Sequence, residues 1–278
     1  MSRPVRISAN PGRLLPVVIA LSIMLVSCTT DAPSRPPTTT SAPAATPAPP
    51  APAELCGGPT TPAQSFWLSA PGGAQLYAAV VGTAFTTTAV FVHEAGPRGL
   101  CRFWPYADWL AKTNGVRSML FSQCGAGASQ CPPGTAADQW LATTTAAVTW
   151  ARAHGVGQIT LVGASAGGIV ALQVAASIHP PVAAVVNVSG ARRWMGLDSL
   201  AAARRLQVPA LFAVAPGDSL VSVGTMQRLY QAAPVRAKRL VVLAEGAGHG
   251  SELLGGTGGS AWTPLAATVA AWIQGRHR

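Results

Sequence analysis

Short apolar runs alternate with longer helical patterns through most of the chain. β-Branched apolar runs predict strands at Ser65–Ala70, Gln75–Val81, Thr88–His93, Val116–Phe121, Ile159–Val162, Pro181–Val188, Val208–Ala215 and Arg239–Leu243. Helical patterns cover Phe103–Lys112, Asp138–His154, Gly168–Ser177, Asp198–Leu206, Val221–Ala232 and Ala261–Ile273. Strands that alternate with helices of this length predict an α/β fold with a mostly parallel central sheet covered by helices on both faces.

The N-terminal pattern is different. Residues 1–27 have three arginines followed by an apolar run of 13 residues, Leu14–Val26, which is shorter than the ~20 residues that span a bilayer. The run ends at Leu25-Val26-Ser27-Cys28, which resembles the bacterial lipobox. That resemblance implies a cleaved lipoprotein signal peptide, lipidation of Cys28, and attachment to the outer face of the bacterial cytoplasmic membrane, within the cell envelope.

The next segment, residues 28–55, is almost wholly Pro, Ala, Thr and Ser after its cysteine. Such a composition buries little apolar surface, so we expect a disordered tether. We expect the folded domain to occupy residues 56–278.

Charge and composition limit the kinds of macromolecule that this chain is expected to bind. The 278-residue chain has a formal charge of +10 with only 10% charged residues. Its basic residues are scattered and form no stripe interleaved with aromatic residues, so we expect no nucleic-acid partner. An anionic lipid or cell-wall polymer is a more natural neighbour for this charge.

Four cysteines lie in the expected domain, and an even number in an exported chain predicts two disulfide bonds. Three pairings are possible. Cys124 and Cys131 flank a glycine-rich loop that one disulfide can close, and this pairing leaves Cys56 to bind Cys101. A metal site is the other interpretation, but no CxxC spacing or nearby histidine supports it.

The most informative stretch is Gly163-Ala164-Ser165-Ala166-Gly167, which fits G-x-S-x-G. It lies between an expected strand and an expected helix, the context of a nucleophile elbow. Small residues let strand and helix approach closely, and the serine Oγ stands at a helix N-terminus where backbone N–H groups face developing negative charge. This context predicts that Ser165 is a catalytic nucleophile.

A serine nucleophile needs a base and an orienting carboxylate. In such a sheet, functional side chains lie on loops beyond the carboxyl ends of strands. Two later loops carry the right types, Asp218 after one strand and His249 after the next. Asp218 also suits a helix cap for Val221–Ala232. Glu245 is a substitute acid, although it shares a loop with the histidine.

An oxyanion formed during acyl transfer needs two backbone N–H donors. We expect one from Ala166, directly after the serine. The second is expected on the loop that follows the strand ending at His93, from Ala95 or Glu94.

Together these motifs resemble the α/β-hydrolase family from about Ser65 onward. The five matching features are the oxyanion loop His93-Glu94-Ala95-Gly96, the G-x-G-x-S loop Gly125–Ser129, the elbow Gly163–Gly167, the acid turn Gly217-Asp218 and the histidine loop Gly248-His249-Gly250. The sequence departs from the family at two places. Glu94 stands where the family usually has Gly, and Gln123-Cys124 stands where it usually has Asp and Arg. About 20 residues separate the strand ending at Val188 from the next, so we expect a minimal cap or none.

The resemblance implies an extracytoplasmic serine hydrolase, most simply a carboxylesterase with a Ser-His-Asp triad and an acyl-enzyme intermediate. It implies no metal and no organic cofactor, and its substrate would be a small-molecule or surface-presented ester. Two alternatives remain: a peptidase or acyltransferase on the same fold, and a lipoprotein that only binds a ligand or partner protein.

Overall fold

The computed structural model describes residues 47–278 except 60, 84–86, 135, 156 and 257–259. The expected signal peptide and Cys28 lie outside the described residues, as does most of the expected tether. The compact unit runs from Thr46 to Arg278. In the described part of the chain, no helix is long and apolar enough to span a membrane.

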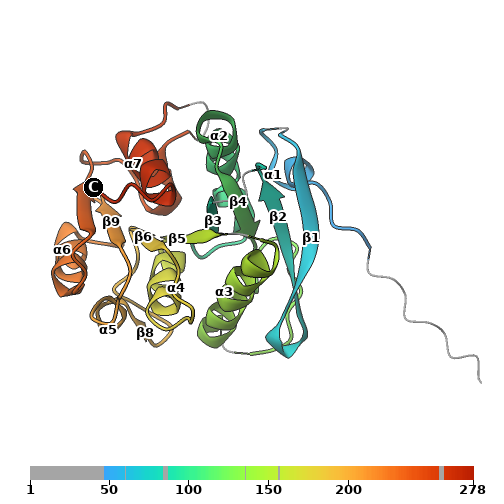
Figure 1. The fold of residues 1–278 in the computed structure, drawn as a ribbon, viewed down its shortest axis with the longest axis horizontal. Coiled ribbons are helices and arrows are strands. Elements are labelled where there is room, and N and C mark those ends of the chain that lie inside the picture. The colour runs from blue at the N-terminus through green and yellow to red at the C-terminus, as the bar shows by residue number, and fades with distance from the viewer. Residues whose placement is uncertain (1–46, 60, 84–86, 135, 156, 257–259) are drawn as a thin grey trace, which may run out of the picture. The chain divides into compact units, whose positions relative to one another are not determined.

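An eight-stranded sheet in the order β1-β2-β4-β3-β5-β6-β9-β10 forms the centre of the molecule (Figure 1). The strands are β1 (Ala63–Ala70), β2 (Ala74–Val81), β3 (Thr87–Val92), β4 (Arg117–Phe121), β5 (Gln158–Ala164), β6 (Ala184–Val188), β9 (Ala210–Val214) and β10 (Lys238–Val242). β1 and β2 pair antiparallel with each other, and β2 is antiparallel to β4. From β4 to β10 every pair is parallel, which confirms the expected fold class. The carboxyl ends of these parallel strands therefore form one edge of the sheet, called the carboxyl edge below.

Helices cover both faces of the sheet, as Figure 1 shows. The larger apolar core packs one face against α3 (Ala136–Ala153), α4 (Ala166–Ala175), α5 (Ser199–Ala203) and α6 (Val223–Ala232). The second core packs the other face against α2 (Trp104–Asn114) and α7 (Pro264–Ile273). Inner strands such as β9 are buried along their whole length, which explains their continuous apolar sequence.

The start of the compact unit lies earlier than the sequence predicts. Residues 47–55, which we assigned to the tether, have a defined structure that ends in the short helix α1 (Pro52–Cys56). The indole N–H of Trp67 donates to the carbonyl of Pro47 at 2.7 Å, and the Tyr77 hydroxyl donates to that of Pro50 at 3.0 Å. A proline-rich segment thus finds partners because its carbonyl groups accept hydrogen bonds from aromatic side chains of β1 and β2.

Both disulfide bonds follow the pairing favoured from the sequence. Cys56 binds Cys101, which joins α1 to the 3-10 helix η2 (Gly99–Arg102) across 45 residues. Cys124 binds Cys131 across 7 residues and closes the loop between β4 and α3.

Two local elements differ from the prediction. The closing helix begins at Pro264 rather than at residue 261. Trp262 pairs with Gly255 in an isolated bridge before it, and proline suits the first position of a helix. A short hairpin of β7 (Arg193–Trp194) and β8 (Leu197–Asp198) follows β6, where we predicted no strand. This hairpin and α5 are the only elements between β6 and β9 in the described chain, consistent with a minimal cap.

Candidate active site

The turn between β5 and α4 holds Ser165 in a strained conformation. Its φ of 50° and ψ of −117° lie outside the regions that side chains normally adopt. The neighbours of the turn hold this geometry: the Ser165 N–H donates to the carbonyl of Val188 on β6, and the Ser165 carbonyl accepts from Gly168 and Ile169 in the first turn of α4. The strand, the sharp turn and the helix expected from the sequence are therefore present.

The glycines of the turn are required by close backbone approach. A Cβ at Gly167 would lie 2.0 Å from the carbonyl oxygen of Val92 at the end of β3. One at Gly163 would lie 2.2 Å from the carbonyl oxygen of Gly167. These contacts are far shorter than any real carbon contact, so only glycine lets α4 begin this close to β3 and β5.

The acid and the histidine predicted from separate loops meet in the structure. Asp218 lies in the loop after β9, and His249 lies in the loop after β10. Nδ1 of His249 and Oδ2 of Asp218 are 2.8 Å apart, and the aspartate side chain is fully buried. Nε2 of His249 is also buried and has no hydrogen-bond partner in the described part of the chain.

The two carboxylate oxygens of Asp218 have separate roles. Oδ2 faces the histidine, whereas Oδ1 accepts from the backbone N–H groups of Leu220 and Val221. Burial alone raises the pKa of Asp218, but the hydrogen bonds from His249 and from these backbone N–H groups outweigh it, so the pKa lies below its usual value. The alternative role of Asp218 as the cap of α6 is not what the structure has, since Ser222 occupies that position and accepts from the Thr225 N–H.

The histidine loop packs against the serine turn. A Cβ at Gly250, the residue after His249, would lie 3.8 Å from the Cβ of Ala164, the residue before Ser165. The substitute acid Glu245 is exposed, and its side chain approaches Gly217 rather than the histidine ring. Ser165, Asp218 and His249 thus lie on three neighbouring loops of one edge.

The predicted oxyanion loop follows β3 directly. Ala166 is the first residue of α4, and Ala95 is exposed on the loop that follows β3. His93 is buried and accepts from the Gln123 N–H at Nε2 (2.8 Å), while Nδ1 lies 2.6 Å from the carbonyl oxygen of Glu94. Burial lowers the pKa of His93 to about 4, so the ring is neutral at neutral pH and joins two loops through both its nitrogens.

Glu94, the departure noted in the sequence, is buried beside the histidine loop. Its Oε1 accepts from the Ser251 hydroxyl at 2.8 Å and lies 3.4 Å from Nε of Arg102. Its carboxyl carbon would lie 3.5 Å from a Cβ at Gly250. Sequence reasoning missed Arg102 and Ser251, because no motif marks them and only the fold brings η2 and the histidine loop together.

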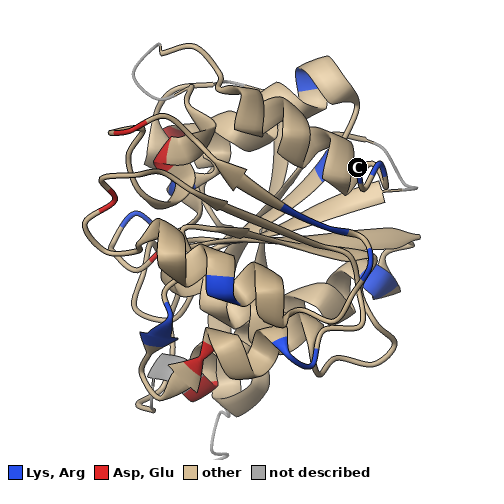
Figure 2. Cartoon of the chain, turned by 90° about the vertical axis from the view of Figure 1, so that its left-hand side faces the viewer, with Lys and Arg blue, Asp and Glu red and all other residues tan. Residues whose placement is uncertain are grey.

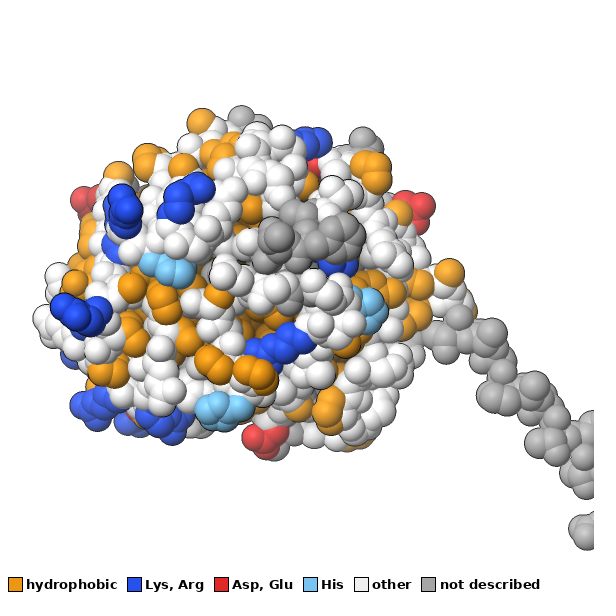
Figure 3. All heavy atoms as spheres, in the orientation of Figure 1, with side chains coloured by type: hydrophobic (Ala, Val, Ile, Leu, Met, Phe, Trp, Pro, Cys, Tyr) orange, Lys and Arg blue, Asp and Glu red, His pale blue; other side chains and the backbone are white. Residues whose placement is uncertain are grey.

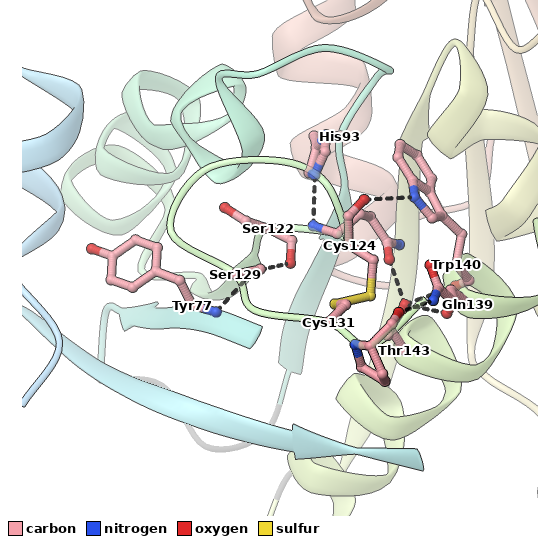
Figure 4. The surroundings of a disulfide bond; sticks show 11 residues. Tyr77, His93, Ser122, Cys124, Ser129, Cys131, Gln139, Trp140 and Thr143 are labelled. Atoms are coloured by element: carbon pink, nitrogen blue, oxygen red, sulfur yellow. Dashed lines mark hydrogen bonds between the residues drawn. A yellow bond between two sulfur atoms is a disulfide. The ribbon is translucent and has the colours of Figure 1, made fainter. Parts of the chain in front are cut away.

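The loop between β4 and α3 lies beside His93 (Figure 4), whose Nε2 it bonds through the Gln123 N–H. Ser129 donates to the carbonyl of Ser122 at 2.7 Å and accepts from the Tyr77 N–H at 2.9 Å. The Cys124–Cys131 disulfide closes the loop, and the Trp140 indole donates to the Cys124 carbonyl at 3.3 Å. Ser129, at the end of the G-x-G-x-S pattern, therefore fixes the loop by bonding both its first residue and the neighbouring strand β2.

A cavity of about 280 Å³ adjoins the oxyanion loop and is lined in part by Tyr77, Pro97, Arg98 and Ser122. Among the described residues, no group of three His, Cys, Asp or Glu side chains is placed to hold a metal ion. The carboxyl edge presents a serine, a histidine hydrogen-bonded to a carboxylate and the backbone N–H groups at the start of α4.

Comparison with known proteins places this geometry in a family. The family model for the alpha/beta hydrolase fold matches residues 88–228, which contain the oxyanion loop, Ser165 and Asp218. The chain belongs to the α/β-hydrolase family. No curated protein sequence matches this α/β-hydrolase significantly.

Solved structures show the same fold at low sequence identity. An esterase from Pyrococcus furiosus has a TM-score of 0.66 and 15% identity over 83% of this chain and 97% of its own. A monoacylglycerol lipase from Paleococcus ferrophilus has a TM-score of 0.59 and 18% identity, covering 72% of this chain and 99% of its own. Est1E from Butyrivibrio proteoclasticus, solved with ferulic acid, has a TM-score of 0.58 and 16% identity, with 76% and 96% covered. At these identities the likeness establishes the fold of the α/β-hydrolase.

Proposed function

We propose that this α/β-hydrolase is an extracytoplasmic serine hydrolase that cleaves carboxylic esters through an acyl-enzyme intermediate. Ser165 is the nucleophile, His249 the general base and Asp218 the acid that orients the histidine. The observation that carries the proposal is the 2.8 Å contact between His249 Nδ1 and Asp218 Oδ2, on a loop packed against the strained turn of Ser165.

The mechanism has two steps. In the first, His249 Nε2 takes the proton of the Ser165 hydroxyl as Oγ bonds to the ester carbonyl carbon; the imidazolium then gives that proton to the departing alcohol. In the second, water attacks the acyl-enzyme, His249 takes its proton, and the proton returns to Ser165 as the acid leaves. The low pKa of Asp218 keeps its carboxylate charged beside the imidazolium formed in both steps.

The oxyanion of each tetrahedral intermediate would be held by the N–H groups of Ala166 and Ala95. Ala166 supports this role because it begins α4, where backbone N–H groups have no helical partner. Ala95 is the better second donor because it lies exposed on the loop, whereas Glu94 is buried.

The substrate class follows from how little covers the carboxyl edge. Between β6 and β9 the described chain has one hairpin of two-residue strands and one helix of five residues. A cover this small favours a small or surface-presented ester over a long acyl chain that must be enclosed. The lipobox-like Cys28 supports attachment to the membrane through a lipid, with the enzyme working in the cell envelope.

A fluorophosphonate probe tests the nucleophile directly. We expect the full chain to be labelled, and Ser165→Ala and His249→Ala to lose labelling and ester hydrolysis with folding unchanged. Ser177→Ala, which removes a hydroxyl at the far end of the α4 region, is the matched control and should be labelled normally. An unlabelled wild-type protein would refute the serine mechanism, and activity in His249→Ala would show that the base is misassigned.

Hydrolysis of matched substrates separates esters from amides. The proposal expects short-chain esters to be cleaved at least about a hundredfold faster than the corresponding amides, since a labile leaving group relaxes the demand on the acid step. Preferential amide cleavage, or acyl transfer to an added alcohol in place of hydrolysis, would assign the same site to a peptidase or acyltransferase.

A further inference from the structure

Carboxylates are concentrated at one end of the parallel strands, whereas several exposed arginines at the opposite end have no acidic partner in the described chain. Six of the eight described carboxylate side chains follow the carboxyl ends of strands or begin the next helix. They are Glu94, Asp138, Asp198, Asp218, Glu245 and Glu252. The carboxyl edge therefore holds most of the described carboxylates, although Arg98, Arg102, Arg192 and Arg193 also lie there and several of these form ion pairs with them.

The opposite end, where the strands begin, carries cations. Exposed arginines lie on the segments that lead into β9 and β10 and on the segment after α7, and we call their surface the basic face. They are Arg204, Arg205, Arg236, Arg239, Arg276 and Arg278. Lys238 and Arg152 lie at the same end but are half-buried and bonded to backbone carbonyl groups.

Contacts hold this surface in place without neutralising it. Arg239 donates to the main-chain oxygen of Arg278 at 2.8 Å, which fastens the last segment beside β10. In the described chain, none of the six arginines forms an ion pair with an Asp or Glu side chain, whereas Arg102, Lys112, Arg192 and Arg193 all do. Apart from Arg239, which bonds the main-chain oxygen of Arg278, these arginines have no carboxylate partner in the described chain and remain available to an external one.

In Figure 2 the Asp and Glu segments lie on the left together with some Lys and Arg, whereas the side near the C-terminal label carries Lys and Arg only. Figure 3 looks onto that side, where Lys and Arg side chains are spread over the left half and acidic ones appear only near the outline. The charges are distributed over a broad surface rather than gathered in a pocket. A broad array of unpaired arginines fits an extended anionic surface better than a small ligand.

We propose that the basic face docks on a bilayer surface rich in anionic lipid headgroups and so turns the carboxyl edge away from that bilayer. Each Lys or Arg near such a surface strengthens binding by about fivefold, and the attraction fades within a Debye length of about 10 Å at 0.1 M salt. At the carboxyl edge carboxylates and arginines largely offset one another, so that edge gains little from the same surface and the basic face sets the orientation. An ester reaching the site would then come from the envelope rather than from the supporting bilayer.

Vesicle co-sedimentation of the full chain carrying Cys28→Ser tests the docking without an attached lipid. Vesicles of phosphatidylglycerol and phosphatidylcholine are compared with vesicles of phosphatidylcholine alone. We expect tighter binding to the anionic vesicles, lost at about 0.5 M NaCl, where the Debye length falls to a few ångströms. The leader contributes equally to every variant, so differences between variants report the folded domain.

Two triple variants with equal net charge locate the effect. Arg236→Gln with Arg239→Gln and Arg276→Gln removes half of the basic face and should weaken anionic binding by about a hundredfold. The control removes three charges elsewhere, through Lys112→Gln, Arg193→Gln and Arg228→Gln, and should weaken it less than about fivefold. Equal losses in the two variants would show that only net charge matters and would overturn the proposal.

Hydrogen exchange of the bound protein reads the orientation without using enzyme activity. Binding should slow exchange in residues 236–239 and 275–278 and leave residues 245–252 unchanged. Protection of 245–252 instead would reverse the orientation. If the basic-face variant loses binding to soluble polyphosphate but keeps binding to anionic vesicles, the surface binds a soluble polyanion and membrane docking is refuted. Each of these outcomes is independent of whether Ser165 is a nucleophile.

Discussion

The serine turn and the acid–histidine pair are held in place by different forces. Backbone packing fixes the turn: Gly163 and Gly167 bring β5, α4 and β3 closer than any side chain allows. Directed hydrogen bonds fix the pair: Asp218 accepts from His249 and from two backbone N–H groups on otherwise exposed loops. Ser165 is thus set by steric contacts within the core, and His249 by a few polar contacts at its edge.

The serine turn and the acid–histidine pair should therefore respond differently to mutation. A steric arrangement fails when volume is added, and its failure costs folding free energy because the contacts belong to the core. A polar arrangement fails when one acceptor is lost, and its failure costs turnover, since the loop keeps its backbone path while the ring loses its orientation. Stability and activity measured on the same variants separate the two.

The largest effect is expected when the polar half is broken. Asp218→Asn keeps the size of the side chain but removes the charge that orients His249, so kcat for an ester should fall by about 10⁴-fold with thermal stability little changed. Glu245→Gln, on the exposed acid of the histidine loop, is the control and should retain activity. Steady-state kinetics of both variants check this, and the reverse ranking would make Glu245 the functional acid.

Breaking the steric half should act on folding. Gly167→Ala places a methyl group 2.0 Å from the Val92 carbonyl oxygen, and we expect a loss of at least about 3 kcal/mol in the free energy of unfolding. Gly224→Ala is matched to it, because this helical glycine of α6 has only an ordinary contact at 3.7 Å and the change should stabilise by about 0.5 kcal/mol. Denaturant titration distinguishes them; a harmless Gly167→Ala would mean that the turn is not held by packing.

The smallest of the three effects concerns His93, whose buried ring hydrogen-bonds two loops beside the serine turn. His93 has a pKa of about 4 in the folded protein, against an ordinary histidine value of 6.5, so between these values the unfolded chain binds more protons. Its contribution, about 3 kcal/mol at most, is fully present above about pH 6.5 and is lost as the pH falls toward 4. Thermal unfolding across this range measures the slope.

His93→Gln should flatten that slope, whereas His154→Gln, at an exposed histidine, should leave it unchanged. If the two variants and the wild-type protein share one slope, the buried ring is not the group that couples stability to pH. A flattened slope in His93→Gln would show that this neutral histidine couples stability to pH. It links the predicted oxyanion loop to the loop that begins at Ser122.

The sequence was most informative where local chemistry decides local structure. The glycines around Ser165 predicted a strand, a sharp turn and a helix, and the structure has all three. The hairpin after β6 went unpredicted, since each of its strands has two residues and leaves no periodic pattern. The structure of residues 47–55 was not predicted either, because their partners are aromatic side chains on β1 and β2 that the local proline-rich sequence does not indicate.

Residue spacing and type were sufficient to predict the strands of the main sheet, its larger helices, the elbow around Ser165 and the candidate residues Asp218 and His249, because each depends on a short segment. The tertiary structure was needed to show which oxygen of Asp218 faces the histidine, that Ser222 caps α6, that Glu94 bonds Ser251, and that most carboxylates lie at one end of the sheet while arginines with no ion pair in the described chain lie at the other. These features join residues distant in the chain, and a parallel sheet brings such residues together only after every crossover has closed.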